Sequence, residues 1–446
     1  MKVFPGTTSR ETLWPRLGGG AAMLIAGRVT SAACGLIQVP FALAHLGNEA
    51  FGLWTALTGL LWSLGILDLG LGYALQNRLA RLLASGREAE ADVLLRRGAR
   101  WLGFAAAGLL LAALPLAFVL PWADWLSATK PTLRAQTPMA IVVTLSSAAI
   151  LLPLPLSARL AAARQETWLT GLWTALGSVV SLLGILLAVR LDLPLAAFVA
   201  AAAALPLILY GGLALHLATR TGRQRTPAAV ATETSGIAAE SMLFFLPQLG
   251  SVFIGVFVPM LVALFAGSAA VASYSVLQRL FGLLSQLNML GLQPTWPAYT
   301  HAAIQGNAAA ARRIYRMSMV VTFAGFVAPT LLLAFVARPI LALWLHDHAP
   351  AVSLTLVWTI ASWNALQCVG QPPAMVLNGL GRNASIAVLG WIGLVVSLIL
   401  CAWLGPVWGA AGVVVALASP YVALNLPIVY WQARRALATI GLATSS

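Results

Sequence analysis

Apolar residues occur along this chain in repeated runs of about 20 residues, and short polar or basic stretches separate the runs. A helix of that length crosses the hydrocarbon layer of a bilayer, where backbone hydrogen-bonding groups cannot remain unpaired. The pattern therefore predicts twelve membrane-spanning helices, at residues 18–46, 50–75, 101–121, 137–158, 168–189, 193–217, 236–265, 272–295, 317–337, 351–377, 384–404 and 409–431.

The composition agrees with this pattern and excludes a soluble domain. Hydrophobic residues make up 60% of the 446 residues and charged residues only 9%, with a mean hydropathy of +0.89. Soluble domains carry about 25% charged residues, because their surfaces face water. The predicted fold class is an all-α polytopic membrane protein.

Most basic residues lie on one side of the predicted membrane. When both termini are placed in the cytoplasm, 20 Lys and Arg fall on that side and four on the other. Arg28 and Arg279 lie inside spans and complete the 26. We therefore expect both termini to be cytoplasmic. The pI near 10.9 then reflects membrane orientation, and no nucleic-acid partner is expected.

The second half of the chain repeats features of the first half. The segment "VPFALAHLGNEAFGLW" (39–54) is echoed by "VPMLVALFAGSAAVASY" (258–274), with Pro40 and Pro259 at an offset of 219 and Gly47 and Gly267 at 220. "ASGREAEADVLLRR" (84–97) is echoed by "IQGNAAAARRIYR" (304–316), again at 220. Both halves begin on the same side, so we expect a parallel repeat with a binding site where the halves meet.

The repeat predicts two six-helix bundles and the segments between and after them. The expected domains are an N-terminal bundle (1–217), a cytoplasmic inter-half loop (218–235), a C-terminal bundle (236–431) and a cytoplasmic tail (432–446).

Several predicted spans carry polar side chains at helical spacing, whereas the third and eleventh carry no charged or amide side chain. Such stripes either line a polar cavity or hold helices together. Because equivalent spans of both halves are striped, we favour a shared substrate cavity. The candidate cavity residues are Arg28, Ser31, Gln38, Gln248, Ser251, Ser275, Gln278, Arg279, Gln286, Asn364 and Gln367.

Three segments carry a resemblance to a known family. "LGNEAFGLWTALTGLLWSLGILDLGLGYALQNRLA" (46–80) closely resembles the end of the first span and the second span of polysaccharide flippases, of the multidrug/oligosaccharidyl-lipid/polysaccharide exporter superfamily. "VASYSVLQRLFGLLSQL" (271–287) and "VLNGLGRNASIAVLG" (376–390) are similar to the matching later pieces. The resemblance implies a V-shaped pair of six-helix bundles and a cavity lined by the first, second, seventh and eighth helices.

The resemblance also implies a function. The expected activity is transfer of an undecaprenyl-pyrophosphate-linked oligosaccharide from the inner to the outer leaflet of a bacterial cytoplasmic membrane, by alternating access, for surface polysaccharide synthesis. Arg28 and Arg279 would then bind the diphosphate group, since guanidinium groups pair well with phosphate oxygens. Their alternative role is a structural ion pair. The expected partners are this lipid-linked oligosaccharide, membrane lipids and a coupling cation, H⁺ or Na⁺.

Two acidic residues in spans, Asp68 and Glu240, are candidates for ion coupling, although structural roles suit both. "HDHA", beginning at His346, resembles part of a zinc site but has no third His or Cys nearby, so no metal and no cofactor are expected. An ion-coupled multidrug exporter of the same superfamily is the alternative function. A membrane glycosyltransferase or polymerase fits less well, and we do not expect an enzyme.

Overall fold

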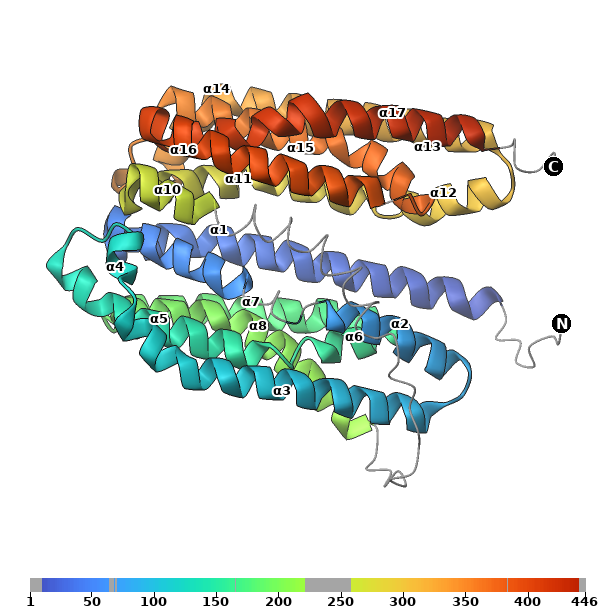
Figure 1. Cartoon of the computed structure of the whole chain (residues 1–446), viewed down its shortest axis with the longest axis horizontal. Helices are drawn as coiled ribbons and strands as arrows, with labels where there is room; N and C mark the ends of the chain where they lie inside the picture. Colours follow the sequence, from blue (N-terminus) through green and yellow to red (C-terminus); the bar gives the residue numbers. More distant parts are fainter. Residues whose placement is uncertain are drawn as a thin grey trace. The chain divides into compact units, whose positions relative to one another are not determined.

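The computed structural model describes residues 10–63, 68, 70–164, 166–220, 258–382 and 384–440, and these residues form helices and turns without a strand (Figure 1). In the first half the helices are α1 (Arg10–Ser63), α2 (Leu71–Ala84), α3 (Glu88–Val119), α4 (Trp122–Trp125), α5 (Pro131–Leu151), α6 (Leu156–Ala163), α7 (Thr167–Arg190) and α8 (Leu195–Arg220).

In the second half two π-helical turns, η3 and η5, interrupt the helices. They are α10 (Val258–Ala266), α11 (Ser268–Leu292), α12 (Thr295–Ile304), α13 (Ala308–Thr322), η3 (Phe323–Val327), α14 (Ala328–Leu345), η4 (His346–His348), α15 (Leu354–Gly379), α16 (Ala384–Pro420), η5 (Tyr421–Asn425) and α17 (Leu426–Thr439).

The predicted fold class is confirmed. Seven stretches of the described chain are long and apolar enough to cross a membrane, judged by length and composition. Two of them, Met23–Trp62 and Val388–Thr439, are each divided by a glycine with non-helical backbone angles, Gly47 and Gly409. Each divided stretch holds parts of two predicted spans. The more polar helices α11 and α15 coincide with the predicted eighth and tenth spans, and most of the predicted seventh span lies outside the described residues.

Two spans that the sequence predicts as single helices are broken, and that part of the prediction was wrong. The predicted 50–75 span divides because α1 ends at Ser63 and Gly70 adopts left-handed angles before α2. The predicted 137–158 span divides at Pro153 and Pro155, between α5 and α6. Proline supplies no backbone N–H and clashes with the preceding turn, so it kinks or breaks a helix unless other groups compensate.

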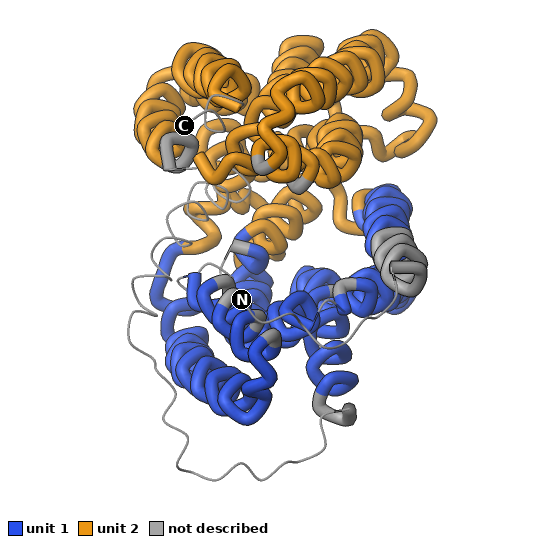
Figure 2. Tube along the Cα trace, turned by 90° about the vertical axis from the view of Figure 1, so that its right-hand side faces the viewer, with its two compact units in different colours: residues 1–42, 60–121, 135–248 blue, residues 43–59, 122–134, 249–446 orange. Residues whose placement is uncertain are grey.

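The described chain forms two compact units, shown in blue and orange in Figure 2. Unit 1 contains residues 1–42, 60–121 and 135–248, and unit 2 contains residues 43–59, 122–134 and 249–446. Unit 2 therefore includes two short segments of the first half. The predicted boundaries of the two bundles and the predicted loop at 218–235, most of which lies outside the described residues, stay predictions.

Backbone geometry reproduces the sequence repeat at four positions. Gly47 (φ 70°, ψ 171°) and Gly267 (φ 85°, ψ 162°) adopt the same conformation, which side-chain-bearing residues rarely reach. Left-handed φ values recur in pairs along the two halves, at offsets of 220, 220, 219 and 217: Gly47 and Gly267, Gly86 and Gly306, Ser127 and His346, Asp192 and Gly409. The parallel repeat predicted from two short echoes therefore extends through both halves.

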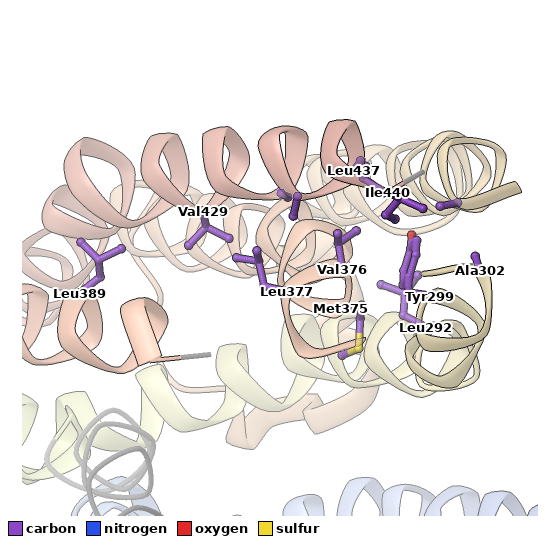
Figure 3. Close-up of a cluster of buried hydrophobic side chains, with 13 residues drawn as sticks. Leu292, Tyr299, Ala302, Met375, Val376, Leu377, Leu389, Val429, Leu437 and Ile440 are labelled. Carbon is purple, nitrogen blue, oxygen red and sulfur yellow. The ribbon is translucent and has the colours of Figure 1, made fainter. Parts of the chain in front are cut away.

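Each unit has its own apolar core. In unit 1 a buried cluster around Leu75, Leu94 and Leu160 joins α2, α3 and α6. In unit 2 a larger cluster joins α12, α13, α15 and α17 and includes the fully buried Tyr299 (Figure 3). These clusters fix the ends of the helices, and the polar side chains lie along the helices away from them.

Candidate functional site

The polar face of α11 brings several candidate residues together within one predicted span. Ser275, Gln278, Arg279 and Ser285 lie along this helix at helical spacing. One side of α11 contacts residues 43–59, and the other side contacts α15, all within unit 2.

Residues from equivalent positions of the two halves contact each other at the start of this face. The Ser275 hydroxyl donates a hydrogen bond of 3.2 Å to Oγ1 of Thr55, and the two residues are 220 positions apart. The Thr55 hydroxyl donates in turn to the carbonyl oxygens of Phe51 and Gly52. Contact between repeat-equivalent residues is expected where a pseudo-two-fold axis passes between them.

Close backbone packing holds these two helices together. A Cβ atom on Gly52 would lie 1.8 Å from the carbonyl oxygen of Ser268, so only glycine permits this approach. The Ser268 hydroxyl donates to the carbonyl oxygen of Ser127, and the Ser127 hydroxyl donates to that of Ala263. The start of α11 is therefore joined to both first-half segments of unit 2.

Arg279 lies one turn further along α11, half-buried and beside an aromatic ring. Its guanidinium carbon is 5.7 Å from the ring centroid of Trp54, which is itself almost fully buried. A guanidinium over the face of a tryptophan is stabilised by the ring's electrostatic field. The ring therefore supports a cation at a depth where isolated charges are costly.

Gln278, the residue before Arg279, contacts α15. Its amide nitrogen donates to Oδ1 of Asn364 at 3.4 Å, and the Asn364 amide donates back to Oε1 of Gln278 at 3.2 Å. Asn364 also donates to the carbonyl oxygen of Ile360 and is fully buried. In this arrangement the predicted cavity amides satisfy each other.

A second polar cluster follows further along the same two helices. Asn288 donates to Oε1 of Gln371 at 2.7 Å and to the carbonyl oxygen of Cys368 at 3.3 Å. Pro372 has no N–H to bond that carbonyl, so Asn288 compensates for the missing helical hydrogen bond. Thr322, beside the η3 turn, donates to Oδ1 of Asn288. The cluster lets α15 continue through two consecutive prolines.

The candidates of the first span lie on α1 in unit 1. Arg28 is exposed, whereas Ser31 and Gln38 are half-buried. Gly27, the neighbour of Arg28, packs so closely on α7 that a Cβ there would lie 2.3 Å from the carbonyl oxygen of Gly171. The Gly27–Gly171 contact fixes α1 against α7 at the level of Arg28.

Asp68 lies next to the break before α2. Its Oδ1 accepts the backbone N–H of Gly70 at 2.8 Å. Its Oδ2 lies beside the guanidinium of Arg159, since both groups are close to Gly72. A Cβ atom on Gly72 would be 2.8 Å from Oδ2 of Asp68 and 3.4 Å from Nε of Arg159. The carboxylate thus caps the start of α2 beside a cation. This contact suits a structural role for Asp68, which was the alternative to ion coupling.

The remaining candidates differ in what the structure describes. Gln286 is exposed on α11, and Gln367 is half-buried on α15. Gln248, Ser251 and Glu240 lie outside the described residues. His346, Asp347 and His348 form the exposed 3-10 turn η4, and the described part of the chain holds no group of three or more His, Cys, Asp or Glu that could bind a metal.

Two residues of this face were missed in the choice of candidates. Trp54 belongs to the repeated segment 39–54 but was not a candidate, although its contact with Arg279 joins the two halves. Asn288 continues the helical spacing of the α11 stripe three residues after Ser285, so that spacing could have identified it.

No family model matches the chain, and no curated protein matches its sequence. The fold, by contrast, matches solved structures over nearly the whole chain. Lipid II flippase MurJ in an inward closed conformation has a TM-score of 0.73, with 11% identity, 94% of this chain covered and 90% of that one. A multidrug resistance MATE family transporter of the MOP superfamily matches in its inward-facing conformation (TM-score 0.70, 15% identity, 91% and 95% covered) and its outward-facing conformation (0.68, 14%, 95% and 96%).

These matches define the class of fold. The chain has the fold of the MOP-superfamily transporters, which the resemblance in the sequence predicted, and it is a multi-pass membrane protein. Identities of 11–15% establish the fold and leave the substrate to be argued from the residues.

Proposed function

We propose that this protein is a flippase that moves an undecaprenyl-pyrophosphate-linked oligosaccharide from the inner to the outer leaflet of a bacterial cytoplasmic membrane, for surface polysaccharide synthesis. The transport cycle is alternating access, driven by a cation, H⁺ or Na⁺. Both termini lie in the cytoplasm, as the distribution of Lys and Arg predicts. The proposal includes no cofactor and no covalent chemistry.

The sign of the charge inside the spans carries the proposal. Arg28 on α1 and Arg279 on α11 are cations at membrane depth, and neither the first span nor α11 contains an Asp or Glu. A substrate with an anionic diphosphate suits such cations, whereas a cationic drug would be repelled by them. We propose that each arginine contacts the diphosphate at some stage of transport.

The fold supports a lipid-linked substrate and also favours one alternative. One of the matched folds belongs to a lipid II flippase, and others belong to multidrug transporters. Export of drugs by the same fold is therefore the second candidate function. The two candidates differ in the charge of the substrate, so one experiment can separate them.

The test is deletion of the gene in its native host, complemented with wild type, Arg28→Ala, Arg279→Ala or Arg279→Lys. Lipid-linked oligosaccharide in membranes and polysaccharide at the surface are measured beside protein abundance. We expect the deletion to accumulate the lipid-linked precursor and lose surface polymer. Both alanine variants should fail at normal abundance, and lysine at 279 should restore part of the activity because it keeps the charge and loses the planar fork.

Arg338→Ala is the matched control, because Arg338 is an exposed arginine that donates to the carbonyl oxygen of Val352 at the end of a span. It should complement fully. Unchanged surface polymer in the deletion, together with increased sensitivity to cationic drugs, would instead establish the exporter. Normal transport by both alanine variants would show that the two cations are structural.

A further inference from the structure

The end of unit 2 that contains the α12–α13 turn carries six exposed arginines and no acid. They are Arg312, Arg313, Arg316, Arg382, Arg434 and Arg435. In residues 258–446 the only acidic residue is Asp347. It lies in η4, which follows the C-terminal end of α14, whereas the α12–α13 turn precedes the N-terminal end of α13. Within the described residues no carboxylate pairs with any of the six. Their counter-charge therefore has to come from outside this part of the protein.

These arginines belong to one surface, because the buried sides of their helices share one core. Ala311 of α13 and Ala433, Ala436 and Leu437 of α17 pack in the same apolar cluster (Figure 3). Arg382 follows α15 and donates a hydrogen bond of 3.5 Å to Thr439 at the end of α17. We call this surface, defined by the six arginines, the basic end of unit 2.

The basic end lies at the depth of lipid headgroups. Residues 317–337 contain no charge and separate Arg316 from Arg338, about 33 Å apart at the helical rise. That length matches the roughly 30 Å hydrocarbon layer, so Arg316 lies at its boundary. Met317 and Val320 on the next turn are 67% and 66% exposed, as expected for side chains that face acyl chains.

A tryptophan marks the same boundary on α17. Trp431 is 53% exposed, and the guanidinium carbon of Arg435 lies 4.0 Å from its ring centroid. Exposed tryptophan is enriched at the level of the headgroups, where one edge contacts apolar chains and the other contacts water. The contact holds Arg435 at that level, beside the lipid phosphates.

We propose that the basic end of unit 2 binds anionic phospholipid headgroups, such as phosphatidylglycerol, in preference to zwitterionic ones. The lipid phosphates and their net negative charge supply the counter-charge that residues 258–446 lack at this end. The binding is independent of the transported substrate and concerns the lipids that surround the protein. It does not rest on the proposed function.

The test uses the purified full chain in detergent with equal amounts of phosphatidylglycerol and phosphatidylcholine, and it counts bound lipids by native mass spectrometry. Wild type should retain phosphatidylglycerol preferentially. Each basic residue near an anionic surface contributes about fivefold in binding. Arg312→Ala/Arg313→Ala/Arg316→Ala should therefore reduce the preference at least tenfold.

A second variant keeps every arginine and adds counter-charge. Ala309 is exposed, and Ala310 occupies the position of Glu90 in the repeat, so Ala309→Glu/Ala310→Glu places acids one turn before Arg313. Acids in the first turn of a helix are favourable, so the variant should fold. It should also reduce the preference for phosphatidylglycerol, while the control Arg338→Ala leaves the preference unchanged.

Three results would overturn the proposal. The folded triple variant could retain the wild-type preference, or Arg338→Ala could lose it as strongly. Undecaprenyl phosphate, added at equal concentration, could displace phosphatidylglycerol from wild type and not from the triple variant, which would assign the surface to the polyprenyl lipid. None of these measurements involves transport, so failure here is distinguishable from failure of the flippase function.

Discussion

Gly86 in unit 1 and Gly306 in unit 2 occupy the same turn of the repeat, and the helices that follow them differ in charge. Both glycines have left-handed φ values, 72° and 65°, and four backbone hydrogen bonds around each are the same at an offset of 220. After Gly86 come Glu88, Glu90 and Asp92, and Arg87 forms an ion pair with Glu90. The helix after Gly306 begins with four alanines followed by two arginines.

The same difference recurs at the next turn on that side. In unit 1 the N–H of Glu166 donates to the carbonyl oxygen of Ala161. In unit 2 the N–H of Arg382 makes the same bond, to the carbonyl oxygen of Leu377. An acid in unit 1 therefore corresponds to an arginine in unit 2. The backbone of the repeat is kept because the turns depend on left-handed glycines and helix-end hydrogen bonds. Surface charge is not constrained in this way. Acids in unit 1 neutralise its arginines in part, whereas we propose that anionic lipids neutralise the arginines of unit 2.

The halves also differ at a pair of prolines inside the membrane. Pro153 and Pro155 end α5, whereas Pro372 and Pro373, at offsets of 219 and 218, lie within the continuous helix α15. Asn288 accounts for the difference by donating to the freed carbonyl oxygen of Cys368. The repeat-equivalent residue of Asn288 is Asp68, which instead caps a helix that starts after a break.

The largest expected effect comes from exchanging these two side chains. Asn288→Asp places a carboxylate at a site that is 1% exposed and removes the amide that donates to the carbonyl oxygen of Cys368. We expect it to destabilise the protein by at least about 3 kcal/mol, because a buried charge without a partner is costly. Asp68→Asn keeps an acceptor for the N–H of Gly70 and should cost about 1 kcal/mol.

Thermal unfolding of both variants in one detergent, followed by size-exclusion chromatography, measures the difference. Asn288→Ser is the neutral control, since serine removes the amide without adding a charge. Equal effects of the two exchanges would show that the repeat-equivalent sites have the same environment.

Substitution of Gly47 and Gly267 should give large and equal effects. Both glycines combine a positive φ with ψ near 170°, a region that other residues reach only with strain. Gly47→Val and Gly267→Val should each cost about 3 kcal/mol, whereas Gly35→Val, at a helical position with open space for a Cβ, should cost much less. The midpoints of thermal unfolding test the equality, and unequal losses would contradict a shared conformation.

Much of the fold could be predicted from the sequence, because the bilayer limits the possibilities. Apolar runs had to be helices, and glycines at a constant offset indicated the repeat through the turns that require them. The breaks at Gly70 and at Pro153 and Pro155 were not predicted, although these residues are known helix breakers. The span limits were predicted from uninterrupted apolar runs, and a glycine or proline does not interrupt such a run. The structure shows that such residues interrupt an apolar run even in a membrane protein.

The candidate site was less predictable. Helical spacing identified the polar face of α11 but not what each side chain contacts, since Gln278 meets Asn364 across 86 residues and Ser275 meets Thr55 across 220. Polar residues that bond to a neighbouring helix and polar residues that face a cavity have the same spacing along a span. The two cases differ only in what the neighbouring helix places opposite them. The roles assigned to Arg28 and Arg279 stay predictions.

The helix caps after the paired glycines provide a smaller test of the comparison. Asn307 caps α13 because its Oδ1 accepts the N–H of Ala310 at 2.9 Å, whereas Arg87 makes no side-chain cap on α3. Asn307→Ala should therefore cost about 1 kcal/mol. Arg87→Ala removes the ion pair of this exposed arginine with Glu90 and should cost less than about 0.5 kcal/mol. Equal losses in thermal unfolding would mean that the cap contributes nothing beyond the shared turn.

The smallest expected change in stability, and the sharpest for the comparison of charge, is Glu88→Gln/Glu90→Gln/Asp92→Asn in unit 1. These substitutions keep side-chain size and remove the local counter-charges of the arginines that follow, so stability should change by less than about 1 kcal/mol. The number of phosphatidylglycerol molecules retained in native mass spectrometry should rise, because unit 1 would then resemble unit 2 in charge. An unchanged number would mean that removing the acids of unit 1 is not enough to create headgroup binding. Binding would then depend on how the arginines of unit 2 are arranged.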